Sequence, residues 1–303
     1  MSYSWGSDSG GSWGGGYTYS SARAANSRRT YSAKTMVGNP SKVASYPLEG
    51  ISTDSKSPLV VAVDVTGSMS DWRDIIFEKL PLLYGEAKRY LPDTEISFAA
   101  IGDVFVDTYP IQVADFYKGK SLDDKIRSFV HCDGGGNGGE SYDLMASFYL
   151  SKCDIPNAKK PIFVFTGDDD IFANTSDDRM RKYLGGNSEG INGVDAVRQL
   201  TKKFDTYLLT KNGYTTDNWE SALGKEKILS LDDPGRVVDT LIGIVAGATG
   251  NFDDFTKRLG TRQTKAQAQT VMKTLHSIAL GNGTQALQIR GSRGGTKKSK
   301  ALI

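Results

Sequence analysis

Cysteine and histidine are scarce in this chain, with two of each among 303 residues. Cys132 and Cys153 cannot build a disulfide framework, and we expect reduced thiols in a cytoplasmic protein. His131 and His276 lack the spacing of zinc ligands. No apolar run reaches the roughly 18 residues of a membrane-spanning helix. The N-terminal sequence MSYSWGSDSGGSWGGG lacks the basic and apolar regions of a secretory signal.

Charge is nearly balanced overall but unevenly distributed. The formal net charge is +2, with 38% hydrophobic and 24% charged residues, as in ordinary globular proteins. Residues 1–57 hold six basic and three acidic side chains, and residues 281–303 hold five basic and none acidic. Residues 58–280 are therefore acidic. Basic tails can bind nucleic acid or acidic surfaces, although short tails are more often simply solvated.

The chain divides by composition into four parts. Residues 1–57 are rich in Gly, Ser, Tyr and Ala without strand or helix periodicity, which predicts a flexible arm. Residues 58–247 form the predicted domain, and residues 248–280 form helices that pack on it or extend it. Residues 281–303 are predicted to be a flexible basic tail. In the last helix, Val271, Leu275 and Ile278 share one face.

Within the domain, apolar strands alternate with amphipathic helices. We predict strands at 59–64, 95–101, 161–166, 205–210 and 227–231. We predict helices at 71–91, 121–130, 140–152, 192–204, 216–223 and 234–247, followed by 251–259 and 262–280. Pro81 should kink or divide the first helix, and a short antiparallel edge pair is expected between Val104 and Val113. The pattern predicts a doubly wound α/β fold: a mostly parallel central sheet, helices on both faces and one antiparallel edge strand.

Three polar loops are expected at the carboxyl edge of this sheet, where open α/β sheets bind ligands. They are Asp64-Val-Thr66-Gly-Ser68 in VVAVDVTGSMSDW, the run DGGGNGGES over 133–141, and TGDDD over 166–170. Each has a structural alternative: a turn in which Asp64 or Ser70 caps a helix, a flexible glycine loop, and a solvated surface turn. Together they bring oxygen ligands for a hard cation from three chain segments to one edge.

These motifs resemble the von Willebrand factor A domain with its metal-ion-dependent adhesion site. AVDVTGSM is similar to the family's Asp-x-Ser-x-Ser loop, and IFVFTGDDD to the strand that ends in the last site aspartate. GGGNGGESYDLMASF resembles the Gly-Gly-Gly-Asp-x-Pro-Glu loop with its helix, and FAAIGD with YPIQVADF resembles the second strand and edge hairpin of intracellular members. The likeness covers about residues 58–247 and implies a Rossmann-like fold.

The resemblance implies bound Mg²⁺, or Mn²⁺ in its place. Thr66 and Ser68 would be direct ligands, and Asp64 and Asp168 would bind directly or through water. The second loop departs from the family pattern, since Gly136 stands where many members have threonine. Asn137, at a position where aspartate is common, would supply a carbonyl oxygen, or Asp133 would substitute. If neither does, metal affinity should fall.

The function implied is divalent-cation-dependent protein binding. An acidic residue of a partner protein would occupy a free coordination position of the metal. The partner could belong to a larger assembly. We expect no membrane to be involved. One alternative is a Mg²⁺-dependent phosphoryl-transfer or hydrolytic enzyme, but the sequence shows no P-loop and no second metal constellation. Another is a nucleic-acid-associated scaffold that uses the basic tails. If metal bridging fails, the face of Val271, Leu275 and Ile278 is the next candidate binding surface.

Overall fold

A computed structural model describes residues 43–281 except 120, 127, 131 and 133–137. The central sheet has six strands in the order β10-β9-β6-β2-β3-β4. All neighbouring strands are parallel except β4, which pairs antiparallel with β3 at one edge. The strands of this sheet are β2 Leu59–Asp64, β3 Ile96–Ile101, β4 Ile111–Val113, β6 Ile162–Gly167, β9 Asp205–Lys211 and β10 Ile228–Leu231. The predicted fold class is confirmed.

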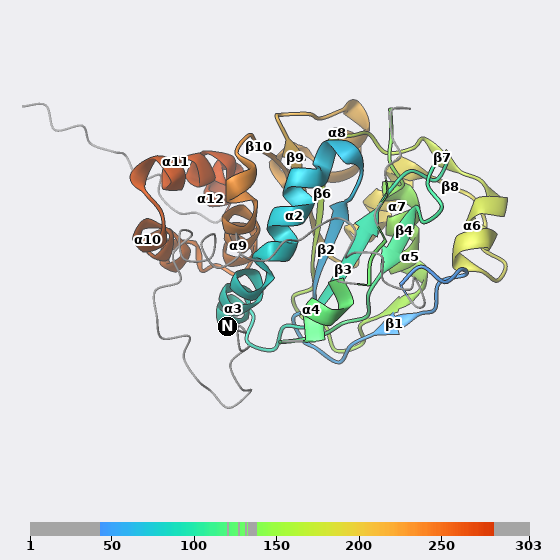
Figure 1. Ribbon diagram of the computed structural model, residues 1–303, viewed down its shortest axis with the longest axis horizontal. Helices are drawn as coiled ribbons and strands as arrows, with labels where there is room; N and C mark the ends of the chain where they lie inside the picture. Colours follow the sequence, from blue (N-terminus) through green and yellow to red (C-terminus); the bar gives the residue numbers. More distant parts are fainter. Residues whose placement is uncertain (1–42, 120, 127, 131, 133–137, 282–303) are drawn as a thin grey trace, which may run out of the picture.

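Helices cover both faces of the sheet (Figure 1). One layer, with side chains of β2 facing it, contains α2 Ser70–Glu78, α3 Leu80–Tyr90, α4 Ser121–Ile126 and α9 Val237–Ala248. The opposite layer contains α5 Tyr142–Ser151, α6 Asp177–Leu184, α7 Gly193–Leu200 and α8 Asp217–Leu223. Within the described ranges, no helix is both long and apolar enough to cross a membrane.

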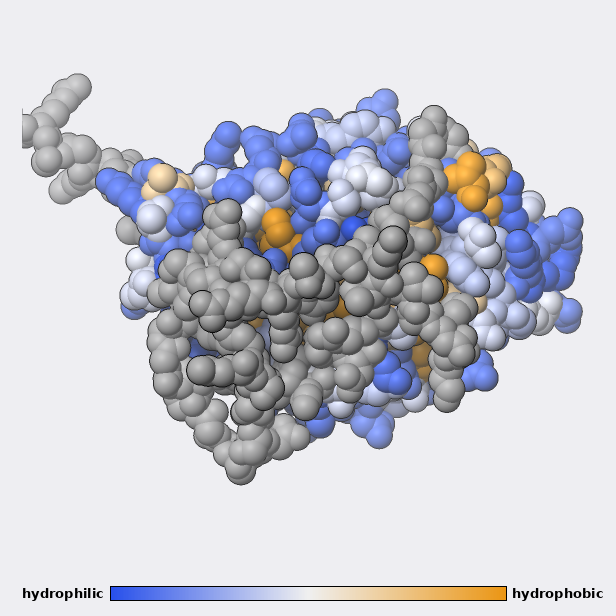
Figure 2. Space-filling model, viewed as in Figure 1, coloured by the Kyte–Doolittle hydropathy of each residue, from blue (hydrophilic) through white to orange (hydrophobic). Residues whose placement is uncertain are grey.

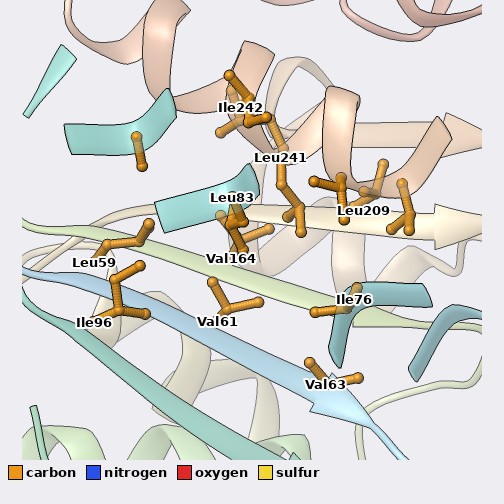
Figure 3. Packing of buried hydrophobic residues seen from close by; sticks show 14 of the residues in the cluster. Leu59, Val61, Val63, Ile76, Leu83, Ile96, Val164, Leu209, Leu241 and Ile242 are labelled. Atoms are coloured by element: carbon orange, nitrogen blue, oxygen red, sulfur yellow. The ribbon is translucent and has the colours of Figure 1, made fainter. Parts of the chain in front are cut away.

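Side chains alternate between the two layers along each buried strand. Val61 and Val63 of β2 belong to the core beneath α3 and α9, whereas Val60 and Ala62 belong to the core beneath α5 and α7. Figure 3 shows Val61 in the first core, together with side chains from neighbouring strands and from the covering helices. Because both faces are covered, β2 is continuously apolar rather than alternating, and its first polar residue is Asp64, where the strand ends.

The helix expected over 71–91 is divided in two. α2 ends at Glu78 and α3 begins at Leu80, with Pro81 in the first turn of α3, where the missing N–H costs nothing. The expected antiparallel edge pair is formed by β4 and β3, and its first strand ends at Ile101, before Val104. β4 pairs with β3, while Asp107 donates its N–H to the Asp103 carbonyl at 2.8 Å and so turns the chain between them.

The C-terminal helices are α10 Phe252–Arg262, α11 Lys265–Thr274 and α12 His276–Gly281. Val271, Leu275 and Ile278 are buried in the same core as α9 rather than presented on the surface. α9 is apolar around most of its circumference, so it needs a cover on the side away from the sheet. The face named above as the next candidate binding surface is therefore occupied within this chain.

Residues 43–57, which the sequence assigns to the arm, contact the domain. Val43 accepts a hydrogen bond from the Val113 N–H at 2.9 Å and so covers part of the edge strand β4. The Tyr46 hydroxyl donates to the Ile111 carbonyl at 2.6 Å, and Leu48 is buried. The segment ends in β1 Ile51–Ser52, which pairs in parallel with β5 Cys153–Asp154. Another two-stranded ribbon joins β7 Asn174–Thr175 to β8 Ile191–Asn192.

Candidate metal site at the carboxyl edge of the sheet

The loop after β2 is organised around a buried carboxylate. Asp64, the last residue of β2, is fully buried, and its Oδ1 accepts from the Thr66 N–H at 2.9 Å and from Thr66 Oγ1 at 2.6 Å. Thr66 Oγ1 lies 3.4 Å from Ser68 Oγ, which is exposed. Neither Asp64 nor Ser70 caps α2, since no side chain bonds the first turn of that helix. The carboxylate instead holds the two hydroxyl groups of the loop in place.

Asp168 joins this loop from the neighbouring strand. Ser68 Oγ donates to Asp168 Oδ1 at 2.9 Å, across 100 residues of sequence. β2 and β6 are paired in parallel with Val63 opposite Thr166, so the ends of both strands lie side by side. Four predicted ligands, Asp64, Thr66, Ser68 and Asp168, thus form one connected chain of oxygen atoms at the sheet edge.

The three consecutive aspartates have different partners. Asp170 Oδ1 accepts from Thr216 Oγ1 at 2.6 Å and its Oδ2 accepts from Asn218 Nδ2 at 2.8 Å, which ties this turn to the start of α8. The Asp169 carbonyl accepts from Trp219 Nε1 at 3.0 Å. Of the three carboxylates, that of Asp168 is the one that bonds to the Ser68 loop. The aspartate turn is therefore held in place by hydrogen bonds to residues at the start of α8, while Asp168 bonds to the Ser68 loop.

Tyr142 and Gly167 support the site and were not predicted from the sequence. The Tyr142 hydroxyl donates to Asp64 Oδ2 at 3.1 Å, and its ring is held edge-on by Trp219 at 5.0 Å. A Cβ at Gly167 would overlap this hydroxyl, so glycine is required where Tyr142 reaches Asp64. A glycine ending an otherwise large apolar strand (IFVFTG) was the available sequence signal.

Part of the glycine-rich loop is described. The Glu140 N–H donates to the Asp170 carbonyl at 2.9 Å, which fixes the end of this loop against the aspartate turn. Gly138 has φ of +80°, a conformation that favours glycine. The predicted ligand Asn137 and its substitute Asp133 lie outside the described residues. Their assignment stays a prediction.

The site carries excess negative charge in a poorly solvated position. Burial raises the pKa of Asp64 to about 7, an effect that hydrogen bonds from Thr66 oppose and the charge of Asp168 adds to. Burial, followed by the charges of Asp64, Asp103 and Asp169, raises the pKa of Glu140 to about 10. Its Oε2 has no hydrogen-bond partner among the described atoms. A cation here would favour the ionised carboxylates, whereas burial and mutual repulsion favour their protonated forms.

The donor set fits a hard divalent cation. The described residues contain no group of three or more His, Cys, Asp or Glu suited to a metal, but this site combines two carboxylates with two hydroxyls. Adjacent ligand oxygens around Mg²⁺, with bonds of about 2.0–2.1 Å, lie about 3 Å apart. Here the neighbouring oxygens are 2.9 Å apart between Ser68 and Asp168 and 3.4 Å apart between Thr66 and Ser68. The spacing is that of oxygens able to share one small ion.

Comparisons with known proteins give similarity to solved structures only. No family model and no curated protein matches the sequence. An open form of the pilus adhesin SpaC from Lactobacillus rhamnosus GG aligns with 68% of this chain at 10% identity and a TM-score of 0.46. Proximal thread matrix protein 1 from the mussel byssus, with a zinc-occupied MIDAS motif, aligns with 65% of this chain at 11% identity and a TM-score of 0.44. This chain spans 31% and 48% of those two structures. The fold and the site therefore rest on the geometry described above.

Proposed function

We propose that this chain is a von Willebrand factor A-type domain that binds a protein partner through Mg²⁺ or Mn²⁺. Asp64, Thr66, Ser68 and Asp168 would hold the ion, with Asn137 or Asp133 as a further ligand. The observation that carries the proposal is the connected series of oxygens from buried Asp64 to exposed Ser68 and on to Asp168. A bound dication would supply an open coordination position for a carboxylate of the partner.

The role of the chain in such binding is electrostatic and positional. Asp64 is fixed by Thr66 and Tyr142, so the site is preorganised before an ion arrives. Without an ion, Asp64 and the aspartate turn repel an acidic ligand, and a dication reverses that local sign. The two hydroxyl ligands are neutral and leave more of the ion's charge available to the partner. Ser68 is exposed, which supports a position for the ion within reach of another protein.

We propose binding rather than catalysis, because Asp64 and Asp170, two carboxylates that could otherwise act as a general base, are held by hydrogen bonds from the protein. Asp170 is engaged by Thr216 and Asn218, and both oxygens of Asp64 are engaged. A cytoplasmic location is also part of the proposal, supported by the buried and unpaired Cys132 and Cys153. Nucleic-acid binding by the basic tails stays a prediction. Salt-dependent binding by the full chain but not by residues 58–280 would support it.

Calorimetric titration with Mg²⁺ and with Mn²⁺ tests the metal site. We expect one ion per chain, with affinity at least about tenfold weaker in Ser68→Ala and in Asp168→Asn. Asp71→Asn is the matched control, since Asp71 is an exposed carboxylate in the first turn of α2 that makes no contact with the site oxygens described above. All four proteins should have similar melting temperatures without metal. Equal ion binding by wild type and Ser68→Ala would place any metal elsewhere.

A further inference from the structure

Exposed large apolar side chains are few among the described residues. They are Phe105, Val106 and Tyr214, with exposed fractions of 53%, 58% and 39%. In Figure 2 the visible face is mostly blue and white outside the grey atoms, with orange areas at the upper right, left of centre and beside the grey atoms. Single exposed apolar residues are ordinary on protein surfaces, whereas a group of them at one place marks an interaction surface. The position of these three residues in the fold therefore decides whether they mark an interaction surface.

All three residues flank the candidate metal site. Phe105 and Val106 lie in the turn after β3, the strand beside β2, and the preceding Val104 N–H donates to Ser141 Oγ at 2.9 Å. This turn is thereby joined to the end of the glycine-rich loop. Asp103 Oδ1 accepts from the Phe105 N–H at 2.7 Å and holds the turn in shape.

Tyr214 lies on the other side of the site, after β9, the strand beside β6. Its carbonyl accepts from Thr210 Oγ1 at 2.6 Å, and Lys211 Nζ from the same segment contacts the Ser68 carbonyl. Burial and the charges of Asp169, Asp170 and Asp168 raise the pKa of its phenol. The site thus has apolar side chains on both flanks.

The Phe105 ring is exposed but held in place. Phe172, which follows the aspartate turn, meets it edge-on with ring centroids 4.8 Å apart. The Arg179 guanidinium lies 3.9 Å from the centre of the Phe105 ring. A ring fixed by two neighbours loses little conformational entropy when a partner covers it. This is the behaviour of a binding anchor rather than of a mobile surface side chain.

We propose that the partner is a protein segment in which an acidic residue is flanked by large apolar side chains. This inference rests on the proposed function: the acidic residue would complete the metal coordination, and apolar side chains would cover Phe105 and Val106 on one flank and Tyr214 on the other. The charge distribution supports this occupant. A bound cation would add to the positive charge of Lys211 beside Ser68 and of Arg179 beside Phe105. A basic segment would instead bind the carboxylates best without a metal.

The test uses random dodecapeptides displayed on phage and selected on the full chain in Mg²⁺. We expect enriched peptides to contain Asp or Glu with Phe, Leu, Ile, Met or Trp close by, and the enrichment to vanish in EDTA. One enriched peptide is then synthesised, and its affinity is measured by fluorescence polarisation. Phe105→Ser combined with Val106→Ser should weaken it by about tenfold or more, and Tyr214→Ser should also weaken it. Mg²⁺ affinity, measured by titration, should stay unchanged in these variants.

Ile155→Ser is the control, since Ile155 is a partly exposed apolar residue in the segment after β5, and it should bind the peptide like wild type. Acidic peptides without an apolar preference, or equal affinity in the Phe105/Val106 double variant, would overturn this inference and leave the metal site standing. Basic or apolar peptides enriched equally in EDTA would overturn both the inference and the metal-bridge function. Failure to enrich any peptide also counts against the inference.

Discussion

The Tyr142 hydroxyl bonds to the buried Asp64 carboxylate at 3.1 Å, and it can do so only because residue 167 is glycine. Tyr142 begins α5 on one layer, Asp64 ends β2, and Gly167 ends β6. The three residues thus connect the helix that follows the glycine-rich loop to the two strands that carry the predicted metal ligands. The arrangement of the site depends on the hydrogen bond from Tyr142 to Asp64.

Gly167→Ala should destabilise the protein by more than about 2 kcal/mol, because the added methyl overlaps the Tyr142 hydroxyl in a close-packed core. Tyr142→Phe removes the hydroxyl oxygen but not the ring. We therefore expect the double variant to lose less stability than the sum of the two single variants. Urea unfolding of all four proteins measures this coupling. Strict additivity would mean that the glycine is not needed for the tyrosine.

Stability of the metal-free protein should fall as pH rises from about 4 to 8. The folded pKa of Asp64 is about 7, above its unfolded value, so the folded state binds the extra proton and loses that advantage as pH rises through 7. Glu140, with a pKa of about 10, and the buried Asp143, with a pKa of about 7, act in the same direction. Asp64→Asn should flatten the dependence below pH 8, as measured by urea unfolding at a series of pH values. A wild-type stability that rises over this range would contradict the assignment.

Added Mg²⁺ should oppose this loss, because the ion competes with the proton for Asp64. We expect the Mg²⁺ affinity to rise with pH, by up to about tenfold per pH unit below pH 7, and to level off above it. Calorimetric titrations at pH 6 and pH 8 measure the difference. Asp71→Asn, the matched control, should show the same pH dependence as wild type. Affinity that does not change between the two pH values would separate metal binding from Asp64.

Removal of residues 1–57 should cost more stability than removal of residues 1–42. The difference isolates residues 43–57, which bury Val43, Ala44 and Leu48 and cover the edge strand β4. Burial of even one such aliphatic side chain contributes about 1.5–3 kcal/mol. We expect the melting temperature of the shorter protein to be lower by about 5 °C or more. Equal melting temperatures would show that this segment is a dispensable arm, as its composition predicts.

Leu275→Ala should destabilise the whole domain by about 2–5 kcal/mol, because Leu275 is fully buried against α9. A Cβ at Gly243 of α9 would overlap Leu275, so Gly243→Ala should be comparably harmful. Lys273→Ala, two residues before Leu275 in the last turn of α11, is the control, since Lys273 lies outside this core. Differential scanning calorimetry should show one cooperative transition that shifts in the two core variants. A separate low-temperature transition would instead mean that α10–α12 unfold independently.

The sequence was sufficient to predict the order and type of the main elements. β2 and β6 are continuous apolar runs because both faces of the sheet are covered, and such runs are readable without a structure. Pro81 marked the break between α2 and α3 because a helix interior rejects proline. The strands of two residues, such as β1 and β7, left no signal, since two residues have no periodicity. The sequence assigns residues 43–57 to an arm because their apolar residues show no helix or strand periodicity. The structure nevertheless buries several of them against the domain.

The candidate ligands could also be predicted from the sequence. A polar residue directly after a buried strand lies at the edge of the sheet, whatever the position of that strand in the strand order. Their grouping was decided by strand order and register, which put β2 beside β6 and so Ser68 within 2.9 Å of Asp168. The family resemblance selected Asp168 from the run TGDDD, and the tertiary structure showed that Asp168 bonds to Ser68 whereas Asp170 bonds to Thr216. It alone placed Phe105 and Tyr214 on two flanks of one site, because exposure and long-range proximity depend on packing between residues far apart in the chain.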